Sequence, residues 1–352
     1  MREPDMLPST VHESHLAGAT LNDLGLSIAG TRLESILVMF REELQQVGLA
    51  VLDPQFYLAT EWGVPFPSTS IAIPFYLACP DLTAYHANKT GLIEGKSDAD
   101  ILRYLRHEMG HVVNYAYRLY DTEAWTAAFG PFSRPYPEEY TPRPFSREFV
   151  HHLPGHYAQK HPDEDWAETF AVWMTPNRDW RREYAGWPVA LGKLEYCARV
   201  MAEFAGQPSQ IEPIQATDDS EEEWDEFAVT LSDFYGIEPE LAELPGLDGA
   251  LRIAFEDATP DRDAGGDAKQ IPISDLIQRV ETELTTNVFR WTGHFPERTR
   301  PLLRLLAKRS DSLNQVYRAD REIAATLTLT ALVTSLAMNY VYRGDYFPAA
   351  SE

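Results

Sequence analysis

The chain has 352 residues, of which 44% are hydrophobic, a composition that supports a folded protein of one or two domains. Its formal net charge of -24 disfavours DNA or RNA as a partner, because phosphate contacts require a basic surface. The two cysteines, Cys79 and Cys197, lack a metal-binding spacing and favour a reducing compartment. Met1 to Asp5 lack the basic start of a signal peptide and lead into no apolar stretch, so we expect a cytoplasmic protein.

The N-terminal part of the chain predicts one scaffold helix. Residues 1–27 are expected to be poorly ordered or loosely packed. Thr31 and Glu34 form a capping-box pattern that marks the start of the helix, and Gly48 marks its end. Between them the apolar residues recur at helical spacing: Leu33, Ile36, Leu37, Phe40, Leu44 and Val47.

The pattern between residues 51 and 78 changes to that of strands. Residues 56–59 form one apolar run, and residues 69–78 form a second run after a proline-rich turn. Pro74 lies inside the second run and cannot donate a hydrogen bond to a central ladder. We therefore predict an edge strand there.

The rest of the chain is organised around a predicted helix over residues 97–120. His107 and His111 are four residues apart, so they lie one turn apart on the same helix face, with Glu108 beside them. Two neutral imidazoles in this fixed relation can bind one zinc ion, and a neighbouring carboxylate can reach what the ion holds. The alternative interpretation is a pair of surface histidines beside a salt-bridging glutamate.

The residues after this motif bear on which group of zinc proteins it matches. The metzincin form of the motif requires a glycine three residues after the second histidine and another histidine three residues later. Asn114 and Tyr117 stand at those positions, which disfavours that group.

Residues 125–154 are rich in proline and aromatic side chains, so no regular element is expected to run through them. This segment is expected to wall or cover the cleft, or simply to wrap around the domain.

A second motif predicts a helix that begins at Pro162 and ends near residue 175. Glu164 and Glu168 are four residues apart and share one face of this helix. Glu164 can complete a metal site with the two histidines, while Glu168 can hydrogen-bond a ligating histidine and fix its tautomer.

Other assignments of the acidic residues in this helix stay open. Asp165 and Glu168 are the alternatives for the third metal ligand. Acidic residues also stabilise the positive end of a helix without any further role, and for Asp163 and Asp165 this is the simpler interpretation.

The two motifs, His-Glu-x-Gly-His followed by Glu-x-x-Ala-Glu, resemble those of the gluzincin group of zinc metallopeptidases. More narrowly, the stretch from Tyr157 to Ala171 is similar to that of a bacterial zinc-binding metallopeptidase family. The resemblance covers roughly residues 50–200 and leaves the C-terminal third unexplained. It implies one bound Zn2+ with three protein ligands: His107, His111 and Glu164.

The resemblance also implies roles for further residues. Glu108 would be the general base, and Glu168 would support a ligating histidine. Tyr157, seven residues before Glu164, matches the spacing of a tyrosine that stabilises the oxyanion in a related toxin protease. One of the nearby histidines could take that role instead: His151, His152, His156 or His161.

The fold that the resemblance implies is α+β. A zincin-like metalloprotease domain over residues 28–205 would place its active-site helix under a small sheet with an exposed edge strand. Zincins bind the substrate backbone along such an edge by strand addition. The predicted edge strand would then line the substrate groove with four residues: Ser70, Ile71, Ala72 and Ile73.

The remainder of the chain predicts an acidic segment and a helical domain. Residues 180–204 are expected to be helical and to close the catalytic domain, while residues 206–270 form an acidic, linker-like segment. Residues 271–352 are expected to form a mainly helical C-terminal domain. Its stretch from 323 to 340 has no charge but several polar residues, which favours a buried helix over a membrane span.

The sequence thus predicts a cytoplasmic zinc metallopeptidase that hydrolyses peptide bonds in a peptide or protein substrate, with neither nucleic acid nor membrane as a partner. One alternative is a protein with a structural zinc site that binds a protein partner through its acidic and C-terminal parts. Another is a zinc hydrolase that acts on a non-peptide amide.

Overall fold

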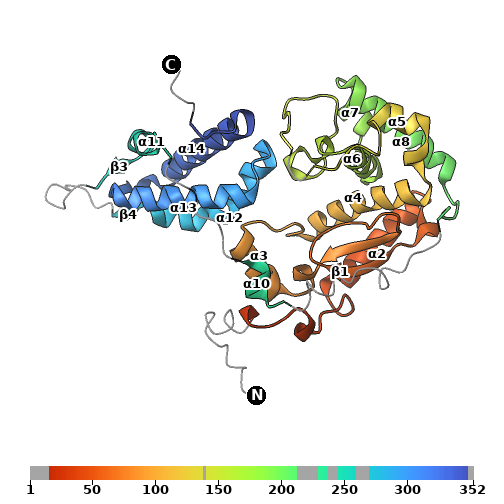
Figure 1. Cartoon of the computed structure of the whole chain (residues 1–352), viewed down its shortest axis with the longest axis horizontal. Helices are drawn as coiled ribbons and strands as arrows, with labels where there is room; N and C mark the ends of the chain where they lie inside the picture. Colours follow the sequence, from red (N-terminus) through yellow and green to blue (C-terminus); the bar gives the residue numbers. More distant parts are fainter. Residues whose placement is uncertain are drawn as a thin grey trace. The chain divides into compact units, whose positions relative to one another are not determined.

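The computed structural model describes residues 16–137, 140–211, 229–236, 241, 244–258 and 269–347. Helices dominate these residues, and short strands form two small sheets, which is compatible with the predicted α+β class (Figure 1). The chain divides into two compact units. Unit 1 comprises Met1–Lys89 and Ile93–Gly236, and unit 2 comprises Thr90–Leu92 and Ile237–Glu352.

The first long helix of unit 1, α2 (Arg32–Gln46), begins where the sequence predicts it. The Thr31 side chain accepts a hydrogen bond from the Leu33 amide, while Glu34 accepts one from the Gly30 amide. Residues 1–15 of the predicted N-terminal segment lie outside the described residues, but Leu21 is buried in the core of unit 1. The buried face of α2 consists of Leu33, Ile36, Leu37, Phe40 and Leu44.

The sheet of unit 1 differs from the predicted one. β1 (Gln55–Ala59) and β2 (Ser70–Pro74) pair in parallel, and on the other side of β2 the Ala72 amide donates to the Gly63 carbonyl at 2.8 Å. Every residue of β2 is buried. β2 is therefore at the edge of a two-stranded sheet, as predicted, but it is buried rather than exposed, and the segment around Gly63 bonds to it at Ala72.

Two helices form the centre of unit 1. α4 (Asp98–Ala116) begins at a capping box of Ser97 and Asp100, and α6 (Pro162–Met174) begins at Pro162, as the sequence predicts. In Figure 1, α4 lies between α6 and the part of unit 1 that contains β1 and α2. At Gly110 the two helices are so close that an added Cβ would lie 2.6 Å from Ala167 Cα.

Shorter elements complete unit 1. α5 (Glu123–Phe129) occupies the start of the segment predicted to be irregular, while residues 130–137 and 140–153 contain no helix or strand. α8 (Pro188–Phe204) packs against α6. The others are η1 (Asn22–Leu24), η2 (Ala50–Leu52), η3 (Phe75–Ala78), α3 (Pro80–Thr90), η4 (Leu119–Asp121), η5 (Pro154–Gln159), α7 (Trp180–Glu183) and α10 (Leu231–Tyr235).

Unit 2 is built on long helices with a core of its own. α12 (Ile273–Thr292), α13 (Pro296–Ser312) and α14 (Glu322–Arg343) pack together with α11 (Leu247–Ala254). The strands of this unit are β3 (Glu256–Asp257), β4 (Gln270–Pro272) and β5 (Gln315–Arg318), and they form a small antiparallel sheet in the order β3-β5-β4. The remaining element is η6 (Ala319–Arg321).

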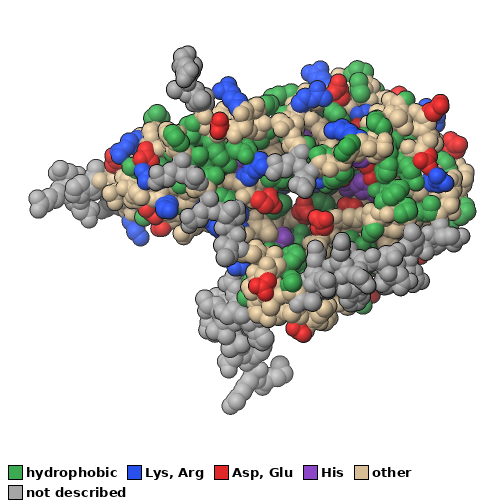
Figure 2. All heavy atoms as spheres, viewed as in Figure 1, with side chains coloured by type: hydrophobic (Ala, Val, Ile, Leu, Met, Phe, Trp, Pro, Cys, Tyr) green, Lys and Arg blue, Asp and Glu red, His purple; other side chains and the backbone are tan. Residues whose placement is uncertain are grey.

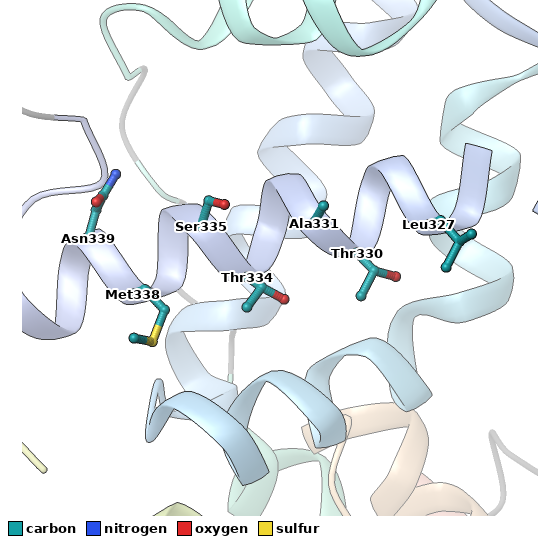
Figure 3. Close-up of a pocket in the computed structure, with 7 residues that line it drawn as sticks. All are labelled: Leu327, Thr330, Ala331, Thr334, Ser335, Met338 and Asn339. Carbon is teal, nitrogen blue, oxygen red and sulfur yellow. The ribbon is translucent and has the colours of Figure 1, made fainter. Parts of the chain in front are cut away.

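Helix α14 is less buried than the sequence predicts. With its preceding turn it is long and apolar enough to cross a membrane by length and composition, and 28% of its most apolar window is buried. Leu329 and Val333 face the core of unit 2, whereas Ile323 is 80% exposed and Leu327 66% exposed. A pocket along α14 is shown in Figure 3, lined by Leu327, Thr330, Ala331, Thr334, Ser335, Met338 and Asn339.

Candidate metal centre

Helices α4 and α6 bring the three predicted metal ligands together. His107 and His111 lie one turn apart on α4, and Glu164 lies in the first turn of α6. One potential ligand atom from each residue lies within 4.8 Å of the other two, and all three residues are buried. This group could hold a metal ion.

The distances between the three donor atoms fit a single ion. Glu164 Oε2 lies 3.0 Å from His107 Nε2 and 3.3 Å from His111 Nε2, and the two imidazole nitrogens are 3.3 Å apart. Ligand atoms at about 2.0 to 2.1 Å from a tetrahedral ion, the distance typical of zinc, are themselves about 3.3 Å apart. The donor set of two imidazoles and a carboxylate therefore matches such a site in both chemistry and spacing.

Glu168 orients the first histidine. Its Oε1 lies 3.0 Å from His107 Nδ1, so this nitrogen donates to the carboxylate and the Nε2 atom is turned toward Glu164. The backbone amides of His152 and Leu153 also donate to Glu168, at 3.0 to 3.1 Å. The loop before η5 is thereby fixed to the ligand set, and Glu168 takes the position that the sequence predicts for it.

Asp163 orients the second histidine, a role that sequence reasoning missed. Its Oδ2 lies 2.9 Å from His111 Nδ1 and accepts a hydrogen bond from the Tyr115 hydroxyl at 2.6 Å. Its other oxygen accepts from the Asn114 amide at 2.7 Å. The only sequence signal for this role is the position of Asp163 next to Glu164, which is equally typical of a helix N-terminus.

The alternatives for the third ligand are engaged elsewhere. Asp165 Oδ2 lies 2.6 Å from Lys193 Nζ in a buried ion pair that ties α6 to α8. Glu168 is bonded to the outer nitrogen of His107 rather than to the nitrogen that faces the triad. Among the acids of α6, Glu164 is the one grouped with the two histidines.

The acidic surroundings favour protonation of both histidines when no metal is bound. Burial lowers the pKa of His107, but the carboxylates of Glu164 and Glu168 more than offset this and raise it to about 9. Burial likewise opposes the charge of His111, yet Asp163 and Glu164 raise its pKa well above the usual value. A metal that binds these nitrogens must therefore displace protons.

Glu108 is a buried carboxylate next to the first histidine. Its side chain is buried, with 4% of the residue exposed, and burial is the main cause that raises its pKa to about 6. No other residue in the described part of the chain hydrogen-bonds its carboxylate. Neither oxygen of this carboxylate is therefore used in holding the two helices together.

Tyr157 lies at the side of the triad, with its ring centroid 5.6 Å from that of His107. Its hydroxyl is 3.2 Å from the hydroxyl of Tyr136. Two of the alternative histidines are occupied: His152 Nε2 bonds the Arg103 carbonyl at 2.9 Å, and His161 Nε2 bonds the Arg134 carbonyl at 2.8 Å. Tyr157 therefore lies beside His107, with its hydroxyl next to that of Tyr136.

The predicted substrate groove is not formed by β2. Ser70, Ile71, Ala72 and Ile73 are each no more than 5% exposed, so the prediction that they line an open groove disagrees with the structure. Their side chains and backbone are enclosed by β1, α4 and the segment around Gly63. Figure 2 shows that histidine side chains are visible on the viewed face of the molecule, among hydrophobic and acidic side chains.

Comparison with known proteins adds no relative. No family model, no curated protein and no solved structure matches the chain. The chemistry of the site is therefore inferred from its residues and their geometry.

Proposed function

We propose that the protein is a zinc-dependent metallopeptidase of the gluzincin type, with a zincin-like arrangement in unit 1. The observation that carries the proposal is the convergence of His107 Nε2, His111 Nε2 and Glu164 Oε2 to within 3.3 Å of one another. Two histidines and one carboxylate form the ligand set of catalytic zinc sites that keep a fourth position for water. A structural zinc site usually has four protein ligands instead.

Each remaining residue has one task in peptide hydrolysis. A zinc ion bound by the triad would lower the pKa of a water molecule and polarise the peptide carbonyl. Glu108 accepts a proton from the attacking water and delivers it to the leaving amine. Tyr157 donates a hydrogen bond to the carbonyl oxygen as negative charge develops there. Burial raises the pKa of Tyr157 well above its usual value, which keeps this donor protonated.

The substrate of the proposed peptidase is a peptide or protein, as the resemblance of the two motifs to those of gluzincins implies. The helix that carries Glu108 and the helix that carries Glu164 pack directly against each other, which holds base and ligands in fixed relation. Cys79 and Cys197 are free thiols, consistent with a cytoplasmic location.

The decisive experiment is cleavage of a proteome-derived peptide library by the zinc-loaded protein, read by mass spectrometry. Glu108→Gln is the matched control because it keeps the size of the side chain but removes the base. We expect cuts that occur only with the wild-type protein, and their sequences would define the specificity. Identical digests from both proteins, each with zinc bound, would refute the proposed peptidase activity.

The exposed apolar face of α14 favours a second candidate function. Ile323 and Leu327 project from unit 2 into solvent, and a protein partner could cover them. The metal site would then stabilise unit 1 without turnover. Zinc binding with no Glu108-dependent reaction on peptides or small amides would single out this candidate.

A further inference from the structure

The two oxygens of Glu164 face different partners. Oε2 is turned toward both histidines, at 3.0 Å from His107 Nε2 and 3.3 Å from His111 Nε2. Oε1 accepts a hydrogen bond from the hydroxyl of Tyr136 at 2.5 Å. One oxygen of the carboxylate therefore faces the two metal-binding histidines, and the other is hydrogen-bonded to a phenol.

The different partners of its two oxygens determine how Glu164 can bind an ion. A carboxylate binds a metal through one oxygen or through both. An oxygen that already accepts a short hydrogen bond is a poor second ligand, because binding would require the carboxylate to turn away from its donor. With Tyr136 in place, Glu164 offers one oxygen only.

We propose that Tyr136 is a positioning residue that holds Glu164 as a one-oxygen metal ligand and so keeps the fourth position of the ion open for water. The inference rests on the metal site of the proposed function, but not on the reaction that occurs there. Three protein ligand atoms give an open tetrahedral site, whereas a carboxylate bound through both oxygens would add a fourth protein atom and crowd that position.

The surroundings of Tyr136 hold it in place. The ammonium group of Lys160 lies over the Tyr136 ring, with Nζ 4.4 Å from the ring centroid. The centroids of the Tyr136 and His161 rings are 5.2 Å apart. Its hydroxyl also lies 3.2 Å from that of Tyr157. The Tyr136 phenol donates its one proton to Glu164, so Tyr157 is the donor in the bond between the two hydroxyls and would release Tyr136 when it donates to a substrate. The two tyrosines thus have separate tasks, one toward the ligand and one toward the substrate.

The test is Tyr136→Phe in the full chain, which removes the hydroxyl and keeps the ring. Cobalt(II) replaces zinc as a spectroscopic probe, because its visible absorption is strong when four-coordinate and weaker when five-coordinate. We expect the variant to show the weaker, five-coordinate spectrum. We also expect its zinc affinity, measured by competition with a chelator, to fall about 10-fold or more, as for other groups that orient ligands.

Tyr140→Phe is the control. Tyr140 comes from the same loop, and its hydroxyl donates to the Gly155 carbonyl at 2.8 Å. We expect its cobalt spectrum and zinc affinity to equal those of the wild type. Tyr136 is 52% exposed, so its substitution should leave the fold intact, which circular dichroism would verify.

The outcomes separate this inference from the proposed function. An unchanged cobalt spectrum and zinc affinity in Tyr136→Phe would overturn the positioning role, even if the wild type cleaves peptides. The expected spectral change would support it, even if no peptide were cleaved. Failure of the wild-type protein to bind zinc or cobalt would overturn both.

Discussion

The carboxylate of Asp163 lies 2.9 Å from Nδ1 of His111 and joins the start of α6 to the second histidine of α4. The same carboxylate accepts hydrogen bonds from Asn114 and Tyr115, so its position is fixed from three sides. Because Nδ1 donates to Asp163, the Nε2 atom of His111 is the nitrogen that faces Glu164. The orientation of one predicted ligand thus depends on a residue of the other helix.

Replacing Asp163 by Asn should weaken metal binding without abolishing it. The variant keeps the shape of the side chain but loses the charge that holds His111 in its tautomer. Loss of such a partner typically costs 10- to 100-fold in metal affinity. Competition with a chelator would measure the change, and Asp98→Asn, an exposed acid in the first turn of α4, is the control. Equal affinities for the two variants would contradict the orienting role.

Removing a ligand should differ sharply from removing the base. We expect His111→Ala and Glu164→Ala to lose stoichiometric metal after dialysis, because two remaining ligands cannot hold the ion tightly. Glu108→Gln should keep the metal and lose turnover. Elemental analysis of the three purified variants measures this. Stoichiometric zinc in Glu164→Ala would show that the third ligand has been assigned wrongly.

Metal affinity should increase with pH. The pKa of His107 is raised to about 9 in the metal-free protein, so at pH 7 this imidazole carries a proton that the metal must displace. Each displaced proton strengthens binding by about 10-fold per unit of pH below that pKa. Affinities measured at pH 6, 7 and 8 in a non-chelating buffer should therefore rise steeply. A flat profile would mean that the histidines are already neutral in the metal-free protein.

Replacing Gly110 by alanine should destabilise unit 1, because there is no room for a Cβ atom between the two helices. A Cβ at this position would lie 2.6 Å from the Ala167 Cα atom, and the Gly110 carbonyl accepts a hydrogen bond from Trp166 Nε1 at 2.7 Å. Gly110→Ala must push α4 and α6 apart, at a cost of about 1 to 3 kcal/mol in unfolding free energy. It should also weaken metal binding, because the ligands lie on both helices.

Gly192→Ala is the matched control for this substitution. Gly192 lies inside α8, and a Cβ there would meet no atom within 4 Å. Alanine is the better helix former, so this variant should be more stable by about 0.5 to 1 kcal/mol. Chemical unfolding and chelator competition on both variants would test the pair. Similar effects of the two substitutions would contradict the packing argument.

Unit 2 should lose stability in acid through His294. This side chain is buried, bonding Thr299 Oγ1 through Nδ1 at 2.8 Å and the Tyr346 hydroxyl through Nε2 at 3.1 Å. Burial is the main cause that lowers its pKa to about 4. The folded state thus favours the neutral imidazole, and its contribution, at most roughly 3 kcal/mol, is present above pH 6.5 and is lost as the pH falls toward 4.

Hydrogen exchange in α13, compared at pH 7 and pH 4.5 after correction for intrinsic rates, would measure this loss. In the wild type the protection should fall with pH. His294→Gln has no group that titrates in this range, so its protection should change less, with α8 of unit 1 as an internal reference. Equal pH dependence in the two proteins would rule out His294 as the cause.

The sequence by itself determined the local features of the site. The starts of α2, α4 and α6 follow from Thr31, Ser97 and Pro162, because capping and the first helical turn depend on residues only a few positions apart. The shared face of His107 and His111 follows from the helix repeat alone. These features could be predicted because each involves a single turn of one element.

Only the tertiary structure decided which groups from different elements meet. Asp163 looked like an ordinary acid at a helix start until α6 was placed against α4, and the loop residue Tyr136 carried no sequence signal at all. The burial of β2 likewise depends on the segment around Gly63. The exposure of one face of α14 depends on which of its residues other parts of unit 2 cover. The physical reason is the same in each case: hydrogen bonding and burial between distant segments depend on their packing in space, which periodicity and composition along the chain do not encode.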